Sequence, residues 1–165
     1  MINKKICATY KELQDNANKN NFSIYGDLDE YNNKFELIHS PNQNYTFGIM
    51  YYDCGIEPQI LLSDDGSKLL VGFEKRVLGL DCNTKTEQFQ IKLVSPFYEF
   101  IKTESCILAI CELDIYAFDF EHQVIWSANL PDVIENYDVS DKKNISVSCA
   151  NGVSLILSLK DGKAV

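Results

Sequence analysis

The residues best suited to acid–base catalysis are two histidines, and they form no catalytic pattern. His39 stands beside a Ser-Pro turn and His122 falls in an expected hairpin loop, so we expect surface positions for both. The chain has no Gly-x-Ser-x-Gly elbow to expose a nucleophilic serine, and no glycine-rich loop to cradle a phosphate. We therefore predict a protein that is not an enzyme and has no catalytic residues.

The cysteines and the acidic turns do not have the spacing of metal ligands. No Cys-x-x-Cys pair exists, and Cys111 and Cys149 occupy equivalent positions of a sequence repeat, which predicts buried, reduced thiols. The run Asp27-Leu28-Asp29-Glu30 lacks the glycine and the terminal glutamate of a calcium-binding EF-hand loop, which favours a solvated turn. We predict no metal and no cofactor.

The charge of the chain limits its partners. The net charge is −9 and the single arginine is Arg76, so the clustered cations that bind a nucleic-acid backbone are missing. The N-terminal segment MINKKICATYKELQ has no apolar core, and no run approaches the roughly 20 apolar residues of a membrane-spanning helix. We expect no nucleic acid, no membrane and a cytoplasmic location.

Acidic and aromatic side chains in the connections form the candidate site for a protein partner. Acidic loops attract a basic partner, although they also simply keep proteins soluble, and the pair Tyr51-Tyr52 beside Asp53 has the character of an interface hot spot. The predicted partner-binding residues are Asp27, Asp29, Glu30, Tyr51, Tyr52, Asp53, Glu57, Asp64, Asp65, Asp138 and Asp141.

A sequence repeat with a period of about 38 residues organises the chain. Leu69, Ile107 and Ile145 are spaced by one full period each time, as are Val77, Ile115 and Val153. A strand candidate precedes each copy, and these candidates are Gln59–Ser63, Phe97–Ile101 and Glu135–Val139. A period between roughly 20 and 50 residues is typical of solenoids and propellers, in which each unit buries its apolar face against the next.

The pattern within the repeats predicts an all-β fold. The runs RVLGLD and DIYAFD are apolar at both parities, as in sheets that are covered on both faces, and helical periodicity is poor. We expect one domain over residues 1–165, with an N-terminal extension (1–21, a short helix or a fraying end), a degenerate unit (22–58) and repeat units 59–96, 97–134 and 135–165. Strand candidates in the degenerate unit are Phe22–Tyr25, Lys34–His39 and Tyr45–Tyr52.

The segment 117–126 (AFDFEHQVIW) resembles the repeat of quinoprotein-type β-propellers, in which Ala-x-Asp ends the third strand and a tryptophan lies in the fourth. The copy that begins at Gly79 keeps the aspartate as Asp81 and has Phe89 in place of the tryptophan, while the turns are similar to those of WD-repeat proteins. The resemblance covers about residues 35–165 and implies antiparallel blades of three to four strands. It implies an architecture and no activity, and the quinone ligands of the family have no matching positions here.

The number of repeats predicts a partial or small propeller. Closed propellers have about four to eight blades, whereas the chain provides three regular units and one degenerate unit. Either a strand from the N-terminus completes the last sheet, or the array is open and leaves edges and apolar faces to be covered. A partner protein or a second copy of the chain, as a homodimer through those edges, is then expected.

Three functions from different classes fit these observations. The first is an acidic immunity protein that neutralises a basic bacterial toxin, such as a nuclease, which rests on small size and acidity alone. The second is a propeller-type scaffold or subunit of a larger assembly. The third is a propeller that binds a small ligand at its open end.

Overall fold

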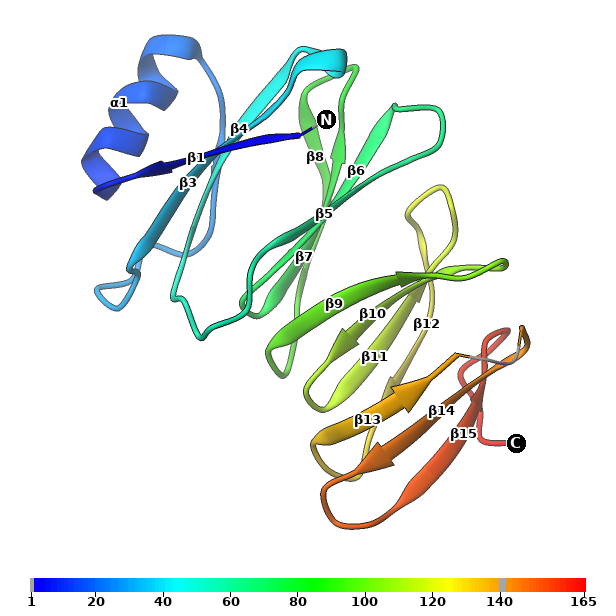
Figure 1. The fold of residues 1–165 in the computed structure, drawn as a ribbon. Coiled ribbons are helices and arrows are strands. Elements are labelled where there is room, and N and C mark those ends of the chain that lie inside the picture. Colours follow the sequence, from blue (N-terminus) through cyan, green and yellow to red (C-terminus); the bar gives the residue numbers. More distant parts are fainter. Residues whose placement is uncertain (1, 140–141) are drawn as a thin grey trace.

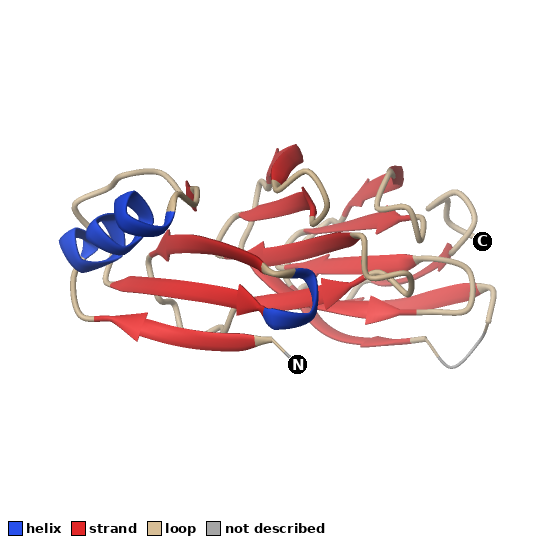
Figure 2. Cartoon of the chain, turned by 90° about the horizontal axis from the view of Figure 1, so that it is seen from above, coloured by secondary structure: helices blue, strands red, loops and turns tan. Residues whose placement is uncertain are grey.

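The computed structural model describes residues 2–139 and 142–165, which form four β-sheets stacked face to face in chain order. Figure 1 shows the sheets fanned out in an arc from the N-terminal helix and sheet to the C-terminal sheet. Figure 2 shows the strands as successive layers, with helix α1 at the outer side of the first layer. This architecture confirms the prediction of an all-β, propeller-like fold with one short N-terminal α-helix.

The first sheet is the irregular one. Its strands have the order β1 (Asn3–Cys7), β3 (Lys34–Ser40), β4 (Tyr45–Tyr51) and β2 (Ile24–Tyr25), with a 3-10 turn at Pro41–Gln43 and helix α1 at Tyr10–Asn20. The short strand β2 pairs parallel to β4, while the other pairs are antiparallel. Residues 3–7, predicted as part of an extension, are instead the edge strand of this sheet, because β1 pairs with β3 along its whole length.

The other three sheets are antiparallel and follow the chain order of their strands. The second contains β5 (Gln59–Leu62), β6 (Lys68–Phe73), β7 (Arg76–Asp81) and β8 (Thr86–Lys92). The third contains β9 (Phe97–Lys102), β10 (Ile107–Cys111), β11 (Asp114–Phe118) and β12 (Val124–Asn129). The fourth contains β13 (Ile134–Asp138), β14 (Asn144–Cys149) and β15 (Ser154–Ser158). The sequence repeat therefore marks equivalent strands, since Leu69, Ile107 and Ile145 lie in β6, β10 and β14.

Three apolar cores fill the spaces between neighbouring sheets. Strands β6 and β10 supply side chains to both of their faces: Leu69 packs toward the first sheet and Leu70 toward the third, while Leu108 packs toward the fourth. Because the side chains of a strand alternate between its faces, the continuous apolar runs read in the sequence are those of sheets buried on both sides.

Helix α1 covers the face of the first sheet that points away from the second sheet. Thr9 caps the helix, accepting a hydrogen bond from the Glu12 amide at 3.2 Å, and Asn21 ends it in the left-handed region at φ 53°. Leu13 and Ala17 are buried against the sheet. Gly48 on β4 leaves room for the helix, since a Cβ there would lie 3.0 Å from Leu13 Cδ1.

The outer face of the fourth sheet is polar on its central strand. On β14 the buried residues Ile145, Val147 and Cys149 alternate with Ser146 and Ser148, which face away from the core. Helix α1 thus covers one end of the stack, while the outer face of the fourth sheet exposes these serines together with Ile156, which lies opposite Ser146 and is 48% exposed.

Of the two alternatives for the last sheet, its completion by an N-terminal strand does not occur. Strand β1 lies in the first sheet, and the pairing added to β15 comes from the C-terminal residues, since Ala164 forms a bridge with Leu157.

The tryptophan position of the repeat joins one sheet to the next. Trp126 on β12 lies opposite Ala117, packs against Gly162 and donates from Nε1 to the Leu159 carbonyl at 2.9 Å. Phe89 occupies the equivalent place opposite Gly79 and stacks on Phe118 of the third sheet, with ring centroids 6.0 Å apart. Both aromatic residues thus form contacts between neighbouring sheets.

Candidate functional site

A cleft of about 330 Å³ lies where the loops of the first two sheets meet, and five residues line it: Asp29, Tyr31, Asn32, Tyr52 and Glu74. We call this set the acidic–aromatic cleft. It draws on the β2–β3 loop, the residue after β4 and the β6–β7 hairpin turn. The two tyrosines are largely accessible, with Tyr31 68% and Tyr52 49% exposed. Exposed tyrosines beside carboxylates are the side chains that attract and then contact a cationic group.

Local hydrogen bonds shape the loop that carries Asp29 and Tyr31. The Asp29 carboxylate accepts from the Tyr31 amide at 3.0 Å, and the Asn32 side chain donates to the Asp27 carbonyl at 2.7 Å. Gly26 begins the loop at φ 126°, where a Cβ would lie 2.1 Å from the Met50 carbonyl oxygen. The backbone can therefore approach β4 closely only because this residue is glycine.

Asp27 ties the loop to the second sheet. Its Oδ2 lies 3.1 Å from Arg76 Nη2 and 3.3 Å from Lys92 Nζ. Hydrogen bonding and charge from the buried Arg76 guanidinium, with a smaller effect of Lys92, lower the pKa of Asp27. The single arginine of the chain thus anchors an acidic loop and is not a surface cation.

Asp53 and Glu74 differ in their electrostatic surroundings. The Gly55 amide at 2.8 Å and Lys34 Nζ at 3.2 Å lower the pKa of Asp53. Glu74, at φ 48° in the tight β6–β7 turn, is desolvated, and this burial raises its pKa against the opposing effect of Arg76. A partly desolvated carboxylate gains more from an incoming cation than a fully hydrated one, because less water has to be displaced.

The structure brings together only part of the predicted site. Asp27, Asp29, Glu30, Tyr52, Asp53 and Glu57 lie in the two connections 26–33 and 52–58, beside the cleft. Tyr51 does not reach a partner, because it is 2% exposed and its hydroxyl donates to the buried Glu36 carboxylate at 2.5 Å. The side chains of a strand alternate, so of this adjacent pair only Tyr52 faces outward.

The remaining predicted residues lie elsewhere. Asp64 and Asp65 occupy the β5–β6 turn at the opposite end of the second sheet, where Asp64 pairs with Lys102 at 2.7 Å. Hydrogen bonds from Ser63 and Ser67 lower the pKa of Asp65 and fix it as a turn residue. Asp138 ends β13 in the fourth sheet, and Asp141 lies outside the described residues.

Sequence reasoning missed Tyr31, Asn32 and Glu74. Tyr31 follows the acidic run that ends at Glu30, so an aromatic residue inside a charged loop was a signal that could have been used. Glu74 reaches the cleft from a hairpin much later in the chain, and only the packing of the second sheet on the first places it there.

The structure tests the positions predicted for the histidines and the cysteines. Five cysteines are buried and reduced as predicted, whereas Cys54 is exposed. His39 is half-buried and its Nδ1 hydrogen-bonds the Thr46 hydroxyl at 2.9 Å. The surface position predicted for His122 is wrong, because this residue is only 2% exposed. Among residues 2–139 and 142–165, no three His, Cys, Asp or Glu side chains come together as metal ligands.

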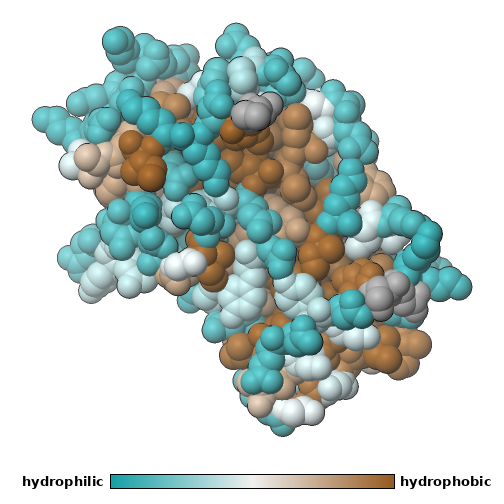
Figure 3. All heavy atoms as spheres, viewed as in Figure 1, coloured by the Kyte–Doolittle hydropathy of each residue, from teal (hydrophilic) through white to brown (hydrophobic). Residues whose placement is uncertain are grey.

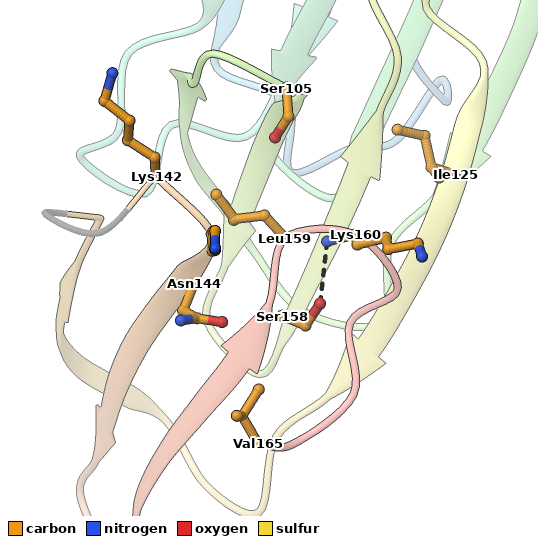
Figure 4. Close-up of a pocket in the computed structure, with 9 residues that line it drawn as sticks. Ser105, Ile125, Lys142, Asn144, Ser158, Leu159, Lys160 and Val165 are labelled. Carbon is orange, nitrogen blue, oxygen red and sulfur yellow. Dashed lines mark hydrogen bonds between the residues drawn. The ribbon is translucent and has the colours of Figure 1, made fainter.

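A second cleft, of about 670 Å³, lies between the third and fourth sheets. Figure 4 shows Ile125, Leu159 and Val165 around it, with Lys142 and Lys160 at its margin and a hydrogen bond of 3.2 Å between the Lys160 amide and Ser158 Oγ. Its lining is mostly apolar, so it is chemically distinct from the acidic–aromatic cleft. Figure 3 shows, on one face, many hydrophilic residues over the first sheet and hydrophobic residues along the middle of the stack.

Comparisons with known proteins give the fold and no family. No family model and no curated protein matches the chain. A dihydro-heme d1 dehydrogenase, NirN, in complex with DHE is similar with a TM-score of 0.51 at 13% identity, over 79% of this chain and 31% of that one. BamB from Moraxella catarrhalis aligns with a TM-score of 0.47 at 13% identity, over 86% of this chain and 47% of that one. The Cps50 (Swd1) β-propeller domain of Myceliophteria thermophila aligns with a TM-score of 0.48 at 10% identity, over 68% of this chain and 38% of that one.

The four stacked sheets, in agreement with the similarity to NirN, define the fold of the chain as β-propeller-like. The chain spans less than half the length of each of these three proteins. At such low identity the likeness extends to the fold and not to a cofactor or an activity. No helix among the described residues is long and apolar enough to cross a membrane.

Proposed function

We propose that this chain is a non-catalytic, propeller-type protein-interaction module that binds a basic segment of a partner in the acidic–aromatic cleft. The observation that carries the proposal is the meeting of exposed Tyr31 and Tyr52 with Asp29 and Glu74 in one cleft. Aromatic residues supply contact area at little cost in side-chain entropy, and the carboxylates steer a lysine or arginine toward them.

The net charge supports a basic partner. At −9 the chain repels acidic proteins and nucleic acids over distances of about one Debye length, roughly 8 Å at physiological salt. Asp27 and Asp53 flank the cleft and pair closely with Arg76 and Lys34 of the chain itself, whereas Glu74 lies 4.0 Å from Arg76 Nη2. Asp29 and the more loosely paired Glu74 are therefore the carboxylates of the cleft that we expect to receive a partner's charge.

The proposal is tested with a defined probe. A lysine- and arginine-rich peptide is titrated into the labelled protein, and amide shifts are expected in segments 26–33, 52–57 and at Glu74. The substitution Tyr52→Ala should weaken binding about tenfold or more, the usual size of a hot-spot effect of roughly 1.4 kcal/mol or above. Asp138→Asn removes one exposed carboxylate of the fourth sheet and is the matched control.

Binding that Asp138→Asn weakens and Tyr52→Ala leaves unchanged would show that only net charge attracts the peptide, and the cleft would then have no special role. Shifts confined to the 63–67 turn would move the site to the opposite end of the second sheet.

The finer form of the proposal is that the partner is a bacterial toxin domain and the chain its immunity protein. Small size and acidity support it, as does a cleft suited to a basic surface. The test is co-expression with the product of the neighbouring gene: protection of the cell that Tyr52→Ala weakens supports the immunity role. A stable multiprotein complex with no inhibition supports the scaffold role instead.

A further inference from the structure

His122 is a buried histidine whose two ring nitrogens have no hydrogen-bond partner among the protein atoms of residues 2–139 and 142–165. It is 2% exposed, and it lies at φ 64° in the turn between β11 and β12. The turn is held by the Asp119 side chain, which accepts from the Gln123 amide at 2.8 Å, and by the His122 amide, which donates to the Asp119 carbonyl at 3.0 Å. A buried polar side chain without partners destabilises a fold, so its presence calls for an explanation.

The imidazole belongs to the contact between the second and third sheets. It lines a cavity of about 40 Å³ together with Lys68 of β6, Gly79 and Leu80 of β7, Gln88 and Phe89 of β8, and its neighbours Glu121 and Gln123. Lys68 crosses the same contact, with its Nζ 2.6 Å from Glu121 Oε2 and 3.1 Å from the Glu121 carbonyl. The cavity has room for about one water molecule, whose share of liquid volume is about 30 Å³.

The charged groups around the ring act in opposite directions. From the second sheet and its 63–67 turn, Lys68 and Asp65 act on the imidazole, and from its own turn Asp119 and Glu121 do so. The residues of β7 and β8 that line the cavity are uncharged. Burial and the Lys68 ammonium lower the pKa of His122, against the smaller effects of the three carboxylates. The neutral ring therefore suits this position and the imidazolium does not.

We propose that His122 is a pH-sensitive latch between the second and third sheets: the neutral ring closes their contact at this end, and protonation releases the 119–123 turn from β7 and β8. In the unfolded chain a histidine has a pKa of about 6.5, and in the folded chain it is lower. The folded state thus binds fewer protons, so the stability due to the latch is present above about pH 6.5 and declines as pH falls toward the folded pKa.

The first test is a proton NMR titration of His39→Gln, in which the remaining histidine signal belongs to His122. We expect half-protonation below pH 6.5, with the amides of residues 119–123 and Lys68 shifting at the same midpoint while those of helix α1 do not. A midpoint at or above pH 6.5, or turn amides that ignore the titration, would overturn the proposal.

The second test separates the latch from general acid sensitivity. Between pH 7.5 and 5.5, where few carboxylates titrate, the Tm of the unmodified chain and of His39→Gln should fall, and that of His122→Gln should fall less. Over the affected range the folding equilibrium constant drops up to about tenfold per pH unit. An equal fall in all three proteins would contradict the latch.

A third variant tests the electrostatic cause and does not depend on whether His122→Gln folds. Lys68→Gln removes the like charge beside the ring, so the NMR midpoint of His122 should rise toward 6.5. A midpoint that stays the same or falls would show that Lys68 does not oppose protonation.

Discussion

Gly162 and Gly152 provide a matched pair that measures the tryptophan contact between the third and fourth sheets. Both have left-handed backbones, at φ 69° and φ 82°, so alanine at either position meets a left-handed penalty of about 1–2 kcal/mol. A Cβ at Gly152 would have no atom within 4 Å, whereas at Gly162 it would lie 2.5 Å from Trp126 Cε3 and 2.8 Å from Cδ2.

The steric cost follows from these distances. Carbon atoms in contact prefer about 3.5–4.0 Å, so the indole must move by about 1 Å, and its hydrogen bond of 2.9 Å to the Leu159 carbonyl holds it in place. Overpacking of this kind costs about 1–3 kcal/mol. We therefore expect Gly162→Ala to lower the free energy of unfolding by about 2–5 kcal/mol and Gly152→Ala by about 1–2 kcal/mol.

The assay is urea unfolding followed by far-UV circular dichroism and by the fluorescence of Trp126, which is the single tryptophan of the chain. Fluorescence reports the junction of the third and fourth sheets, while circular dichroism reports all four. If Gly162→Ala costs no more than Gly152→Ala within about 0.5 kcal/mol, the size of an ordinary surface substitution, the indole does not lock the two sheets together and the reasoning is refuted.

Three further predictions concern the ends and the cores of the stack. Leu13→Ala should lower the free energy of unfolding by about 2–5 kcal/mol, because the fully buried Leu13 side chain packs between α1 and the first sheet. Equilibrium unfolding measures this loss, and Lys11→Ala on the exposed side of α1 should leave the stability nearly unchanged. In the native protein at pH 8 a disulfide reagent should modify Cys54 rapidly and the five buried thiols slowly, since burial shields them and raises the pKa of Cys82 to about 11. Denaturant should make all six thiols reactive, and rapid reaction of several thiols in the native protein would contradict their burial. Tyr51→Phe should lower the free energy of unfolding in urea by about 1–3 kcal/mol, because the buried Glu36 carboxylate loses the Tyr51 hydroxyl as its donor. An unchanged unfolding midpoint would mean that a water molecule replaces that hydroxyl.

The candidate site could be read from the sequence only in part. Loop composition indicated Asp29 and Tyr52, because turn residues and acidic side chains are visible locally. Glu74 was out of reach, since its approach to the β2–β3 loop depends on how one sheet packs on another. Tyr51 and His122 were misjudged for a related reason: strand parity and the depth of a turn between two sheets decide burial, and neither is written in the local residue types.

The sequence by itself determined the unit of the fold. The regular repeat, apolar runs at both parities and aspartates that close the turns predict stacked antiparallel sheets, because these are local hydrogen-bonding and burial requirements. Tertiary structure alone decided how the first sheet is completed and covered and where the clefts lie. Strand β1 joined the first sheet because β3 offered it a free edge, α1 covered the face left open there, and the acidic–aromatic cleft formed where residues far apart in the chain meet.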